Sequence, residues 1–83
     1  MGKKEFPRYP VLDFIATGEN IRRLRLEHGY SVIDLQEYLG LACLQGIYHW
    51  QNGKSLPSTD NLYALSKLWG VSMNDILKEQ KSA

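Results

Sequence analysis

The sequence predicts an all-α fold: a compact five-helix orthogonal bundle that follows an extended N-terminal arm. From about residue 17 onward, apolar residues recur every three or four positions, which is the spacing of one buried helix face. Residues that cap or stop helices divide these apolar segments into five short stretches. The alternation of apolar and polar residues that marks strands is almost absent, so helices must supply the core.

Each helix is expected between a capping residue and a stopping residue. Serine or threonine before a helix accepts a hydrogen bond from a free backbone N–H, and glycine after a helix readily adopts the left-handed conformation. Asp34 and Asp75 each follow a capping serine by three positions, the spacing of a capping box. The expected caps and stops are Thr17, His28-Gly29, Ser31, Gly40, Asn52-Gly53, Ser58, Gly70 and Ser72. The core is expected to hold Ile21, Leu24, Leu35, Tyr38, Leu39, Ile47, Trp50, Leu62, Tyr63, Leu65, Leu68, Trp69, Ile76 and Leu77.

A length of 83 residues leaves room for one domain. We divide the chain into an N-terminal arm at 1–17, a helical domain at 18–78 and a disordered tail at 79–83. Pro7 and Pro10 favour extended backbone in the arm. Residues 11–15 either pair as a short strand or lie over the core.

Several function classes find no support in this sequence. No apolar stretch approaches the roughly 20 residues that span a bilayer, and no secretory signal is present. One cysteine, Cys43, rules out an internal disulfide and suits a reducing cytoplasm. The chain has no glycine-rich phosphate loop, no paired metal-ligand spacing and no nucleophile beside a base. We therefore expect no enzyme activity, cofactor, metal or small-molecule ligand, and a cytoplasmic location.

The charge pattern gives modest support for a nucleic-acid partner. The net charge is only +1 and the isoelectric point is near 7.9. However, no acidic residue occurs from Ala42 to Thr59. A surface that faces phosphate should lack carboxylates, so this segment is the best candidate for such a surface.

The segment around Gly40 predicts two short helices that cross steeply. In a helix-turn-helix, such a glycine lets the second helix leave the first at an angle and lie in the major groove. Residues 18–77 resemble the XRE family, the DNA-binding domains of phage repressors and Cro-like regulators. The matching residues are Ile21-Arg22-Arg23-Leu24-Arg25, Gly29-Tyr30-Ser31, Asp34-Leu35, Leu39-Gly40, Ile47, Trp50-Gln51-Asn52-Gly53-Lys54, Leu56-Pro57-Ser58, Asn61-Leu62, Leu65-Ser66, Leu68-Trp69-Gly70-Val71-Ser72 and Asp75-Ile76-Leu77. The resemblance implies the five-helix fold and operator binding.

Two positions depart from the family pattern. The segment from Leu39 to Trp50 is one residue longer than usual, and Gln36 occupies a position that the family keeps small. A small residue stands instead at Gly46, inside the third helix, where glycine costs about 1 kcal/mol relative to alanine. We expect Gly46 to let that helix pass over Gln36 or over a phosphate.

The resemblance also implies which side chains contact DNA. If Ile47 and Trp50 face the core, the family pattern makes Leu44, Gln45 and His49 the base-reading residues. A glutamine amide can bond bidentately to adenine, which makes Gln45 the best candidate. Tyr48 either reaches phosphate or joins the core, and each arginine of the first helix either contacts phosphate or is merely solvated. The residues expected at phosphates are Arg22, Arg23, Cys43, Tyr48, Asn52, Lys54 and Ser55, with further charge from Arg25.

These expectations describe a sequence-specific transcriptional regulator, a repressor on family grounds, that binds double-stranded DNA as a homodimer. We place the dimer contact at residues 69–77 with help from residues 6–15. We expect the N-terminus to be an unstructured tail. Its basic residues Lys3, Lys4 and Arg8 leave a minor-groove arm as the alternative. A second function is kept open: a protein-interaction module or antitoxin-like accessory factor of the same fold. Leu44 favours that alternative, because an apolar residue reads few bases.

Overall fold

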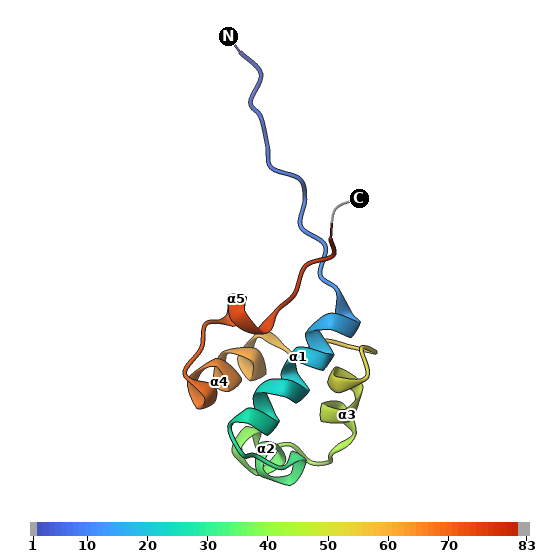
Figure 1. Cartoon of the computed structure of the whole chain (residues 1–83), viewed down its shortest axis with the longest axis vertical. Coiled ribbons are helices and arrows are strands. Elements are labelled where there is room, and N and C mark those ends of the chain that lie inside the picture. The colour runs from blue at the N-terminus through green and yellow to red at the C-terminus, as the bar shows by residue number, and fades with distance from the viewer. Residues whose placement is uncertain (1, 82–83) are drawn as a thin grey trace.

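The computed structural model describes residues 2–81 and places five α-helices there, which confirms the predicted all-α bundle (Figure 1). The helices are α1 (Phe14–Glu27), α2 (Val32–Leu39), α3 (Gln45–Gln51), α4 (Thr59–Trp69) and α5 (Met73–Ile76). Within residues 2–81, none of these helices is long and apolar enough to cross a membrane.

Helix α1 is the central element, with α3 packed against one side of it and α5 against another (Figure 1). Helix α4 packs on α5, and α2 contacts α3. Apolar side chains from all five helices meet in a single core, as the spacing predicted. Its buried members are Ile21, Leu24, Leu35, Ile47, Trp50, Leu62, Leu65, Trp69 and Ile76.

The predicted caps of α2, α4 and α5 are confirmed. Ser31 and Ser72 each accept a hydrogen bond from the backbone N–H three residues on, at 3.0 and 3.1 Å, and Asp34 and Asp75 complete both capping boxes. Ser58 accepts from the Asn61 backbone N–H at 3.3 Å. These bonds satisfy N–H groups that a helix start otherwise leaves free, which is why short helices can form here.

The predicted start of α1 is wrong. Asp13 is the cap, and its carboxylate accepts a hydrogen bond from the Ala16 backbone N–H at 2.9 Å. Thr17, expected to be the cap, lies inside the helix and is fully buried. Its hydroxyl oxygen accepts from the Lys78 backbone N–H at 2.9 Å, so a contact across 61 residues decides its role. The last four residues assigned to the arm, 14–17, thus form the first turn of α1.

The arm and the C-terminal segment leave the bundle side by side (Figure 1). Leu12 and Glu79 form an isolated antiparallel bridge. Of residues 11–15, expected either to pair as a short strand or to lie over the core, Leu12 thus pairs, whereas Phe14 and Ile15 belong to α1. The Gln80 N–H donates to the Val11 carbonyl at 2.8 Å, and the Asp13 N–H donates to the Lys78 carbonyl at 2.8 Å. The expected disordered tail is therefore paired at residues 79–80, and residues 82–83 lie outside the described residues.

The two tyrosines expected in the core are not there. Tyr38 and Tyr63 remain 48% and 54% exposed, whereas Trp50 and Trp69 are buried as predicted. The Tyr38 hydroxyl donates to the Ala64 carbonyl at 3.2 Å, so this ring lies along the α2–α4 surface with its polar end satisfied. A phenol loses less than an aliphatic side chain by staying at the surface, because its hydroxyl must find a partner when buried.

Candidate nucleic-acid interface

The position of α3 depends on close backbone contact with α1 at Gly18. A Cβ atom at this glycine would overlap the carbonyl oxygen of Trp50 and lie 2.8 Å from that of Gln51. At the end of α3, Gly53 has a φ of 76°, and a Cβ there would lie 2.7 Å from Ile15 Cγ1. Two glycines therefore let the helices approach until backbone meets backbone, which holds α3 rigidly on α1.

A buried arginine makes the second connection between these helices. The Arg25 guanidinium donates to the Gln51 side-chain oxygen at 3.0 Å and to the Tyr30 carbonyl at 2.8 Å. Only 9% of Arg25 is exposed, so its charge is used inside the protein. The expectation that Arg25 adds charge to a DNA-facing surface is not supported by this geometry.

The turn between α2 and α3 accommodates both departures from the family pattern. The Gln36 side-chain amide donates to the Leu41 carbonyl at 3.2 Å, and the Leu41 N–H donates to the Gln36 carbonyl at 3.1 Å. Gln36 thus holds the lengthened turn. The expectation that Gly46 makes room for Gln36 is wrong, because a Cβ at Gly46 would have no atom within 4 Å. The other possibility, close approach of a phosphate, stays a prediction.

Three polar residues, Gln45, His49 and Asn52, follow one another along the outer side of α3 and its C-cap and are called the stripe below. Ile47 and Trp50 point into the core as predicted, which turns Gln45 and His49 outward at i and i+4, with Asn52 following three positions later. Gln45 and Asn52 are exposed and His49 is half-buried. Tyr48 is 46% exposed beside the stripe and does not join the core. Leu44 is half-buried at the N-cap of α3, so only part of it can face a ligand.

The expected phosphate-contacting residues divide into two groups. Cys43, Asn52, Lys54 and Ser55 flank α3, and Ser55 alone of these is half-buried. Arg22 is exposed and lies four residues from Gly18, on the α3 side of α1. Arg23 lies elsewhere: it bonds to Asn20 at 2.6 Å and forms an ion pair with Glu27 at 2.8 Å. Asn20 in turn donates to the Asp75 carbonyl at 2.8 Å, which places Arg23 towards α5.

The buried residues that position α1 against its neighbours and so hold α3 in place were not identified from the sequence. These residues are buried behind the stripe. Gly18 sets where α1 meets α3, Thr17 where it meets the C-terminal segment, and Asn20 where it meets α5. A signal for Gly18 was present, since a glycine inside a helical pattern often marks close backbone packing. Among residues 2–81, no cluster of three His, Cys, Asp or Glu side chains could hold a metal ion.

Comparison with known proteins identifies the family to which this fold belongs. A helix-turn-helix family model matches residues 21–76, which include α2, the turn and α3. The chain belongs to the XRE-type helix-turn-helix family. The region outside the match comprises the arm, the first part of α1 and the C-terminal segment.

A curated relative supports this helix-turn-helix assignment. The SPbeta prophage-derived uncharacterized HTH-type transcriptional regulator YonR of Bacillus subtilis (strain 168) is 34% identical over 61 residues, which cover 74% of this chain. The match spans only 56% of YonR, so this chain corresponds to about half of that relative.

Two solved structures share the helix-turn-helix fold. The restriction-modification controller protein C.AhdI from Aeromonas hydrophila superposes with a TM-score of 0.67 at 22% identity, over 77% of this chain and 96% of that one. The DNA-binding domain of BldD gives a TM-score of 0.64 at 20% identity, over 78% and 93%. At these identities the likeness establishes the fold.

Proposed function

We propose that this protein is a sequence-specific, non-enzymatic DNA-binding transcription regulator that inserts α3 into the major groove. The observation that carries the proposal is the outward-facing stripe Gln45–His49–Asn52, exposed at Gln45 and Asn52 and half-buried at His49, on a helix held from behind by Gly18 and Arg25. A rigid helix with polar side chains on its outer side can be placed against base edges without losing its own packing. Membership of the helix-turn-helix family supports this use of the stripe.

Each side chain of the stripe offers a distinct contact. The Gln45 amide can donate to N7 of adenine and accept from its N6 amino group as a bidentate pair, and His49 can donate to guanine N7 or O6. The exposed part of Leu44 can pack on a thymine methyl group. Around the stripe, Asn52, Lys54 and Ser55 from the turn after α3 can bind one strand's phosphates. Arg22, Cys43 and Tyr48 are the remaining phosphate-contacting candidates on the α3 side.

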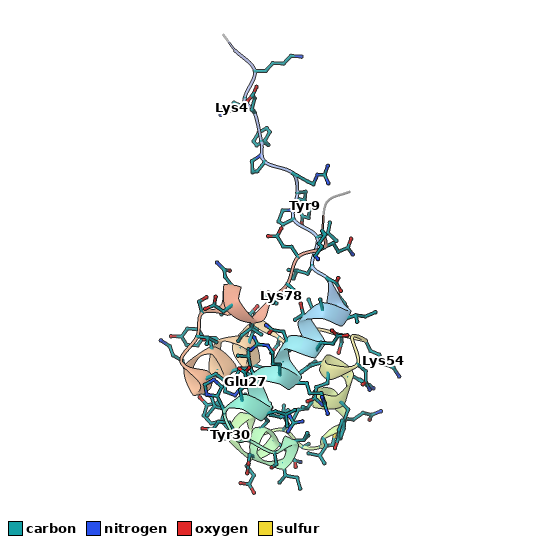
Figure 2. The ribbon with its side chains drawn as sticks, in the orientation of Figure 1. Lys4, Tyr9, Glu27, Tyr30, Lys54 and Lys78 are labelled. Atoms are coloured by element: carbon teal, nitrogen blue, oxygen red, sulfur yellow. The ribbon has the colours of Figure 1, made fainter. Side chains whose placement is uncertain are left out.

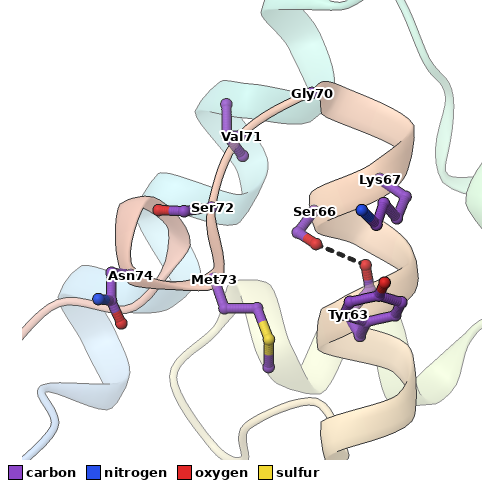
Figure 3. Close-up of a pocket in the computed structure, with 8 residues that line it drawn as sticks. All are labelled: Tyr63, Ser66, Lys67, Gly70, Val71, Ser72, Met73 and Asn74. Atoms are coloured by element: carbon purple, nitrogen blue, oxygen red, sulfur yellow. Dashed lines mark hydrogen bonds between the residues drawn. The ribbon is translucent and has the colours of Figure 1, made fainter.

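We propose in addition that the protein acts as a homodimer. A single module of this size buries only about 600–1,000 Å² on DNA, and two half-sites about one helical turn apart raise the affinity. An open groove of about 600 Å³ between α4 and α5 supports this, because Tyr63, Val71 and Met73 line it (Figure 3). Figure 3 also shows the Ser66 hydroxyl bonded to the Tyr63 carbonyl, at 2.6 Å, on the groove wall. Sedimentation of a Val71→Asp variant as monomers would support this groove as the dimer contact.

The regulatory role is proposed from the relatives. YonR is described as a transcriptional regulator and C.AhdI as a controller protein, and both descriptions favour control of transcription over catalysis. Repression in a bacterial cytoplasm is the form we propose, since an α3 bound at an operator blocks other proteins there.

Selection of bound duplexes from a random pool, at about 100 mM salt, tests the proposed function. We expect an enriched pseudo-palindrome. Gln45→Ala should relax preference at one base pair by about 1–3 kcal/mol, whereas Lys54→Ala should weaken all sequences alike. If the intact chain enriches no sequence and its affinity for DNA does not depend on salt, the protein-interaction alternative is the better account.

A further inference from the structure

The folded bundle supplies few positive charges to the proposed DNA-binding side. Of the Lys and Arg residues in the sequence, Arg25 is buried against Gln51 and Arg23 pairs with Glu27 away from α3. Arg22 and Lys54 are then the two that remain beside α3. Since DNA affinity at moderate salt depends on the number of neutralised phosphates, two cations per chain make a weak electrostatic contact.

Further positive charge lies in the arm, defined here as residues 2–12. The arm holds three of the ten Lys and Arg residues, Lys3, Lys4 and Arg8, and only one of the nine Asp and Glu residues. Its net charge is therefore +2, whereas the rest of the chain is −1. All three cations are exposed and none forms an ion pair among the described residues.

The first turn of α1, into which the arm leads, lies against the turn that follows α3. Ile15, in the first turn of α1, contacts Gly53 so closely that a Cβ there would lie 2.8 Å from the Ile15 Cα. Lys54 is the next residue, and Figure 2 shows it on the flank of the bundle while Lys4 and Tyr9 lie on the projecting arm. The arm therefore joins the bundle three residues before the side chain that contacts the expected phosphate-binding turn.

The arm is also long enough to reach beyond the groove that α3 enters. Eleven extended residues span at most roughly 35 Å, against a major groove about 12 Å wide. Pro7 and Pro10 restrict the backbone to extended conformations, so less conformational entropy is lost when the arm is ordered on a ligand.

We propose that the arm binds the phosphate backbone of the DNA that flanks the site read by α3, through Lys3, Lys4 and Arg8. This inference rests on the proposed function and adds a second contact to it. A cleft between the arm and the C-terminal segment carries Arg8 and Lys81, with Glu79 as its one carboxylate, and provides a further cationic position near the arm's root. The net charge favours DNA over a protein partner, although Phe6 and Tyr9 are more than 80% exposed.

The test is the salt dependence of affinity for a mixed-sequence duplex of about 30 base pairs, measured by fluorescence anisotropy with the full chain. The arm variant is K3Q/K4Q/R8Q. The control is R23Q/K78Q, which removes two positive charges outside the arm, one on α1 and one after α5, and leaves Lys67 on the wall of the α4–α5 groove unchanged. Each neutralised phosphate contributes about 0.9 to the slope of log K against log salt. We expect the slope of the arm variant to fall in magnitude by about 2.7 for each chain bound, with at least roughly ten-fold weaker binding at about 100 mM salt, and the control to keep its slope.

Sedimentation of the same proteins distinguishes a phosphate contact from a dimer contact in the arm. Equal slopes for the arm variant and the intact chain overturn the inference, as does an equal loss in the control. A reduced slope that accompanies dissociation of a dimer also overturns it, because separation alone removes phosphate contacts. If F6A/Y9A changes the oligomeric state while K3Q/K4Q/R8Q leaves DNA binding intact, the arm is a protein contact. An intact chain with no salt dependence refutes the proposed function itself, which is a distinct result.

Discussion

The side-chain amide of Gln36 in α2 donates a 3.2 Å hydrogen bond to the carbonyl oxygen of Leu41, beyond the end of that helix. The bond closes the turn that orients α3, and both residues are half-buried. We predict that Gln36→Ala lowers the free energy of unfolding by about 1 kcal/mol, the contribution of one neutral hydrogen bond. Urea denaturation measures this, with Gln45→Ala as the control: the same amide, fully outside the core, should change stability by less than about 0.5 kcal/mol. Equal stability losses in the two variants would show that Gln36 does not hold the turn.

Two glycines of the interface should respond oppositely to alanine. Gly18→Ala places a methyl group against the Trp50 and Gln51 carbonyl oxygens, and backbone cannot move aside, so we expect a loss of roughly 1–3 kcal/mol. Gly46→Ala meets no atom and should raise stability by about 0.5–1 kcal/mol through helix propensity. Thermal melts compare the two. A Gly46→Ala protein that is more stable yet binds DNA more weakly would indicate that a phosphate approaches the backbone there; unchanged DNA affinity would count against that approach.

Alanine substitutions of the three arginines of α1 should have three different effects on stability and on the salt dependence of DNA binding. Arg25→Ala removes buried hydrogen bonds to Gln51 and Tyr30, so stability should fall by roughly 1.5–3 kcal/mol. Arg22→Ala should leave stability nearly unchanged and reduce the salt slope of DNA binding by about 0.9 for each chain bound. Arg23→Ala should alter neither quantity by much, because its exposed pair with Glu27 contributes little. A slope change for Arg23→Ala as large as that for Arg22→Ala would mean that DNA reaches the α5 side.

Stability should fall in acid through the capping box of α5. The Ser72 backbone N–H, followed by its side chain, lowers the pKa of Asp75 from its ordinary value. A carboxyl whose pKa is lower in the folded state stabilises the fold above the unfolded pKa near 4, and this stabilisation is lost as the pH falls through the lowered value. We expect the free energy of unfolding of Asp75→Asn to vary less with pH below about 4 than that of the unaltered chain. Parallel pH curves for the two proteins would contradict this.

The elements that local chemistry decides were predictable from sequence. Ser31, Ser58 and Ser72 cap helices, and Gly40 and Gly70 end them with φ values of 66° and 65°, because each effect operates within a few residues. The start of α1 could not be predicted in this way. Asp13 and Thr17 are both competent caps, and only the pairing of this segment with Lys78 at the far end of the chain decides between them.

The candidate site shows the same division. The apolar spacing of Ile47 and Trp50 predicted which side of α3 faces outward. The spacing could not tell which arginine of α1 is free to contact DNA. Arg25 is used by Gln51, and Arg23 by Asn20 and Glu27. These partners are known only once the fold is known. The roles of Arg22, Gln45, His49 and Lys54 towards DNA remain predictions.

The backbone hydrogen bond between Val11 and Gln80, at 2.8 Å, makes a circular permutation of the chain possible. Because these two positions are adjacent, a short linker could join them, and new ends could be opened at the exposed turn between His28 and Gly29. Such a circular permutant would keep every helix and the outer side of α3 but lack residues 2–10 of the arm, so recognition helices could be exchanged on it without the arm's contribution to binding.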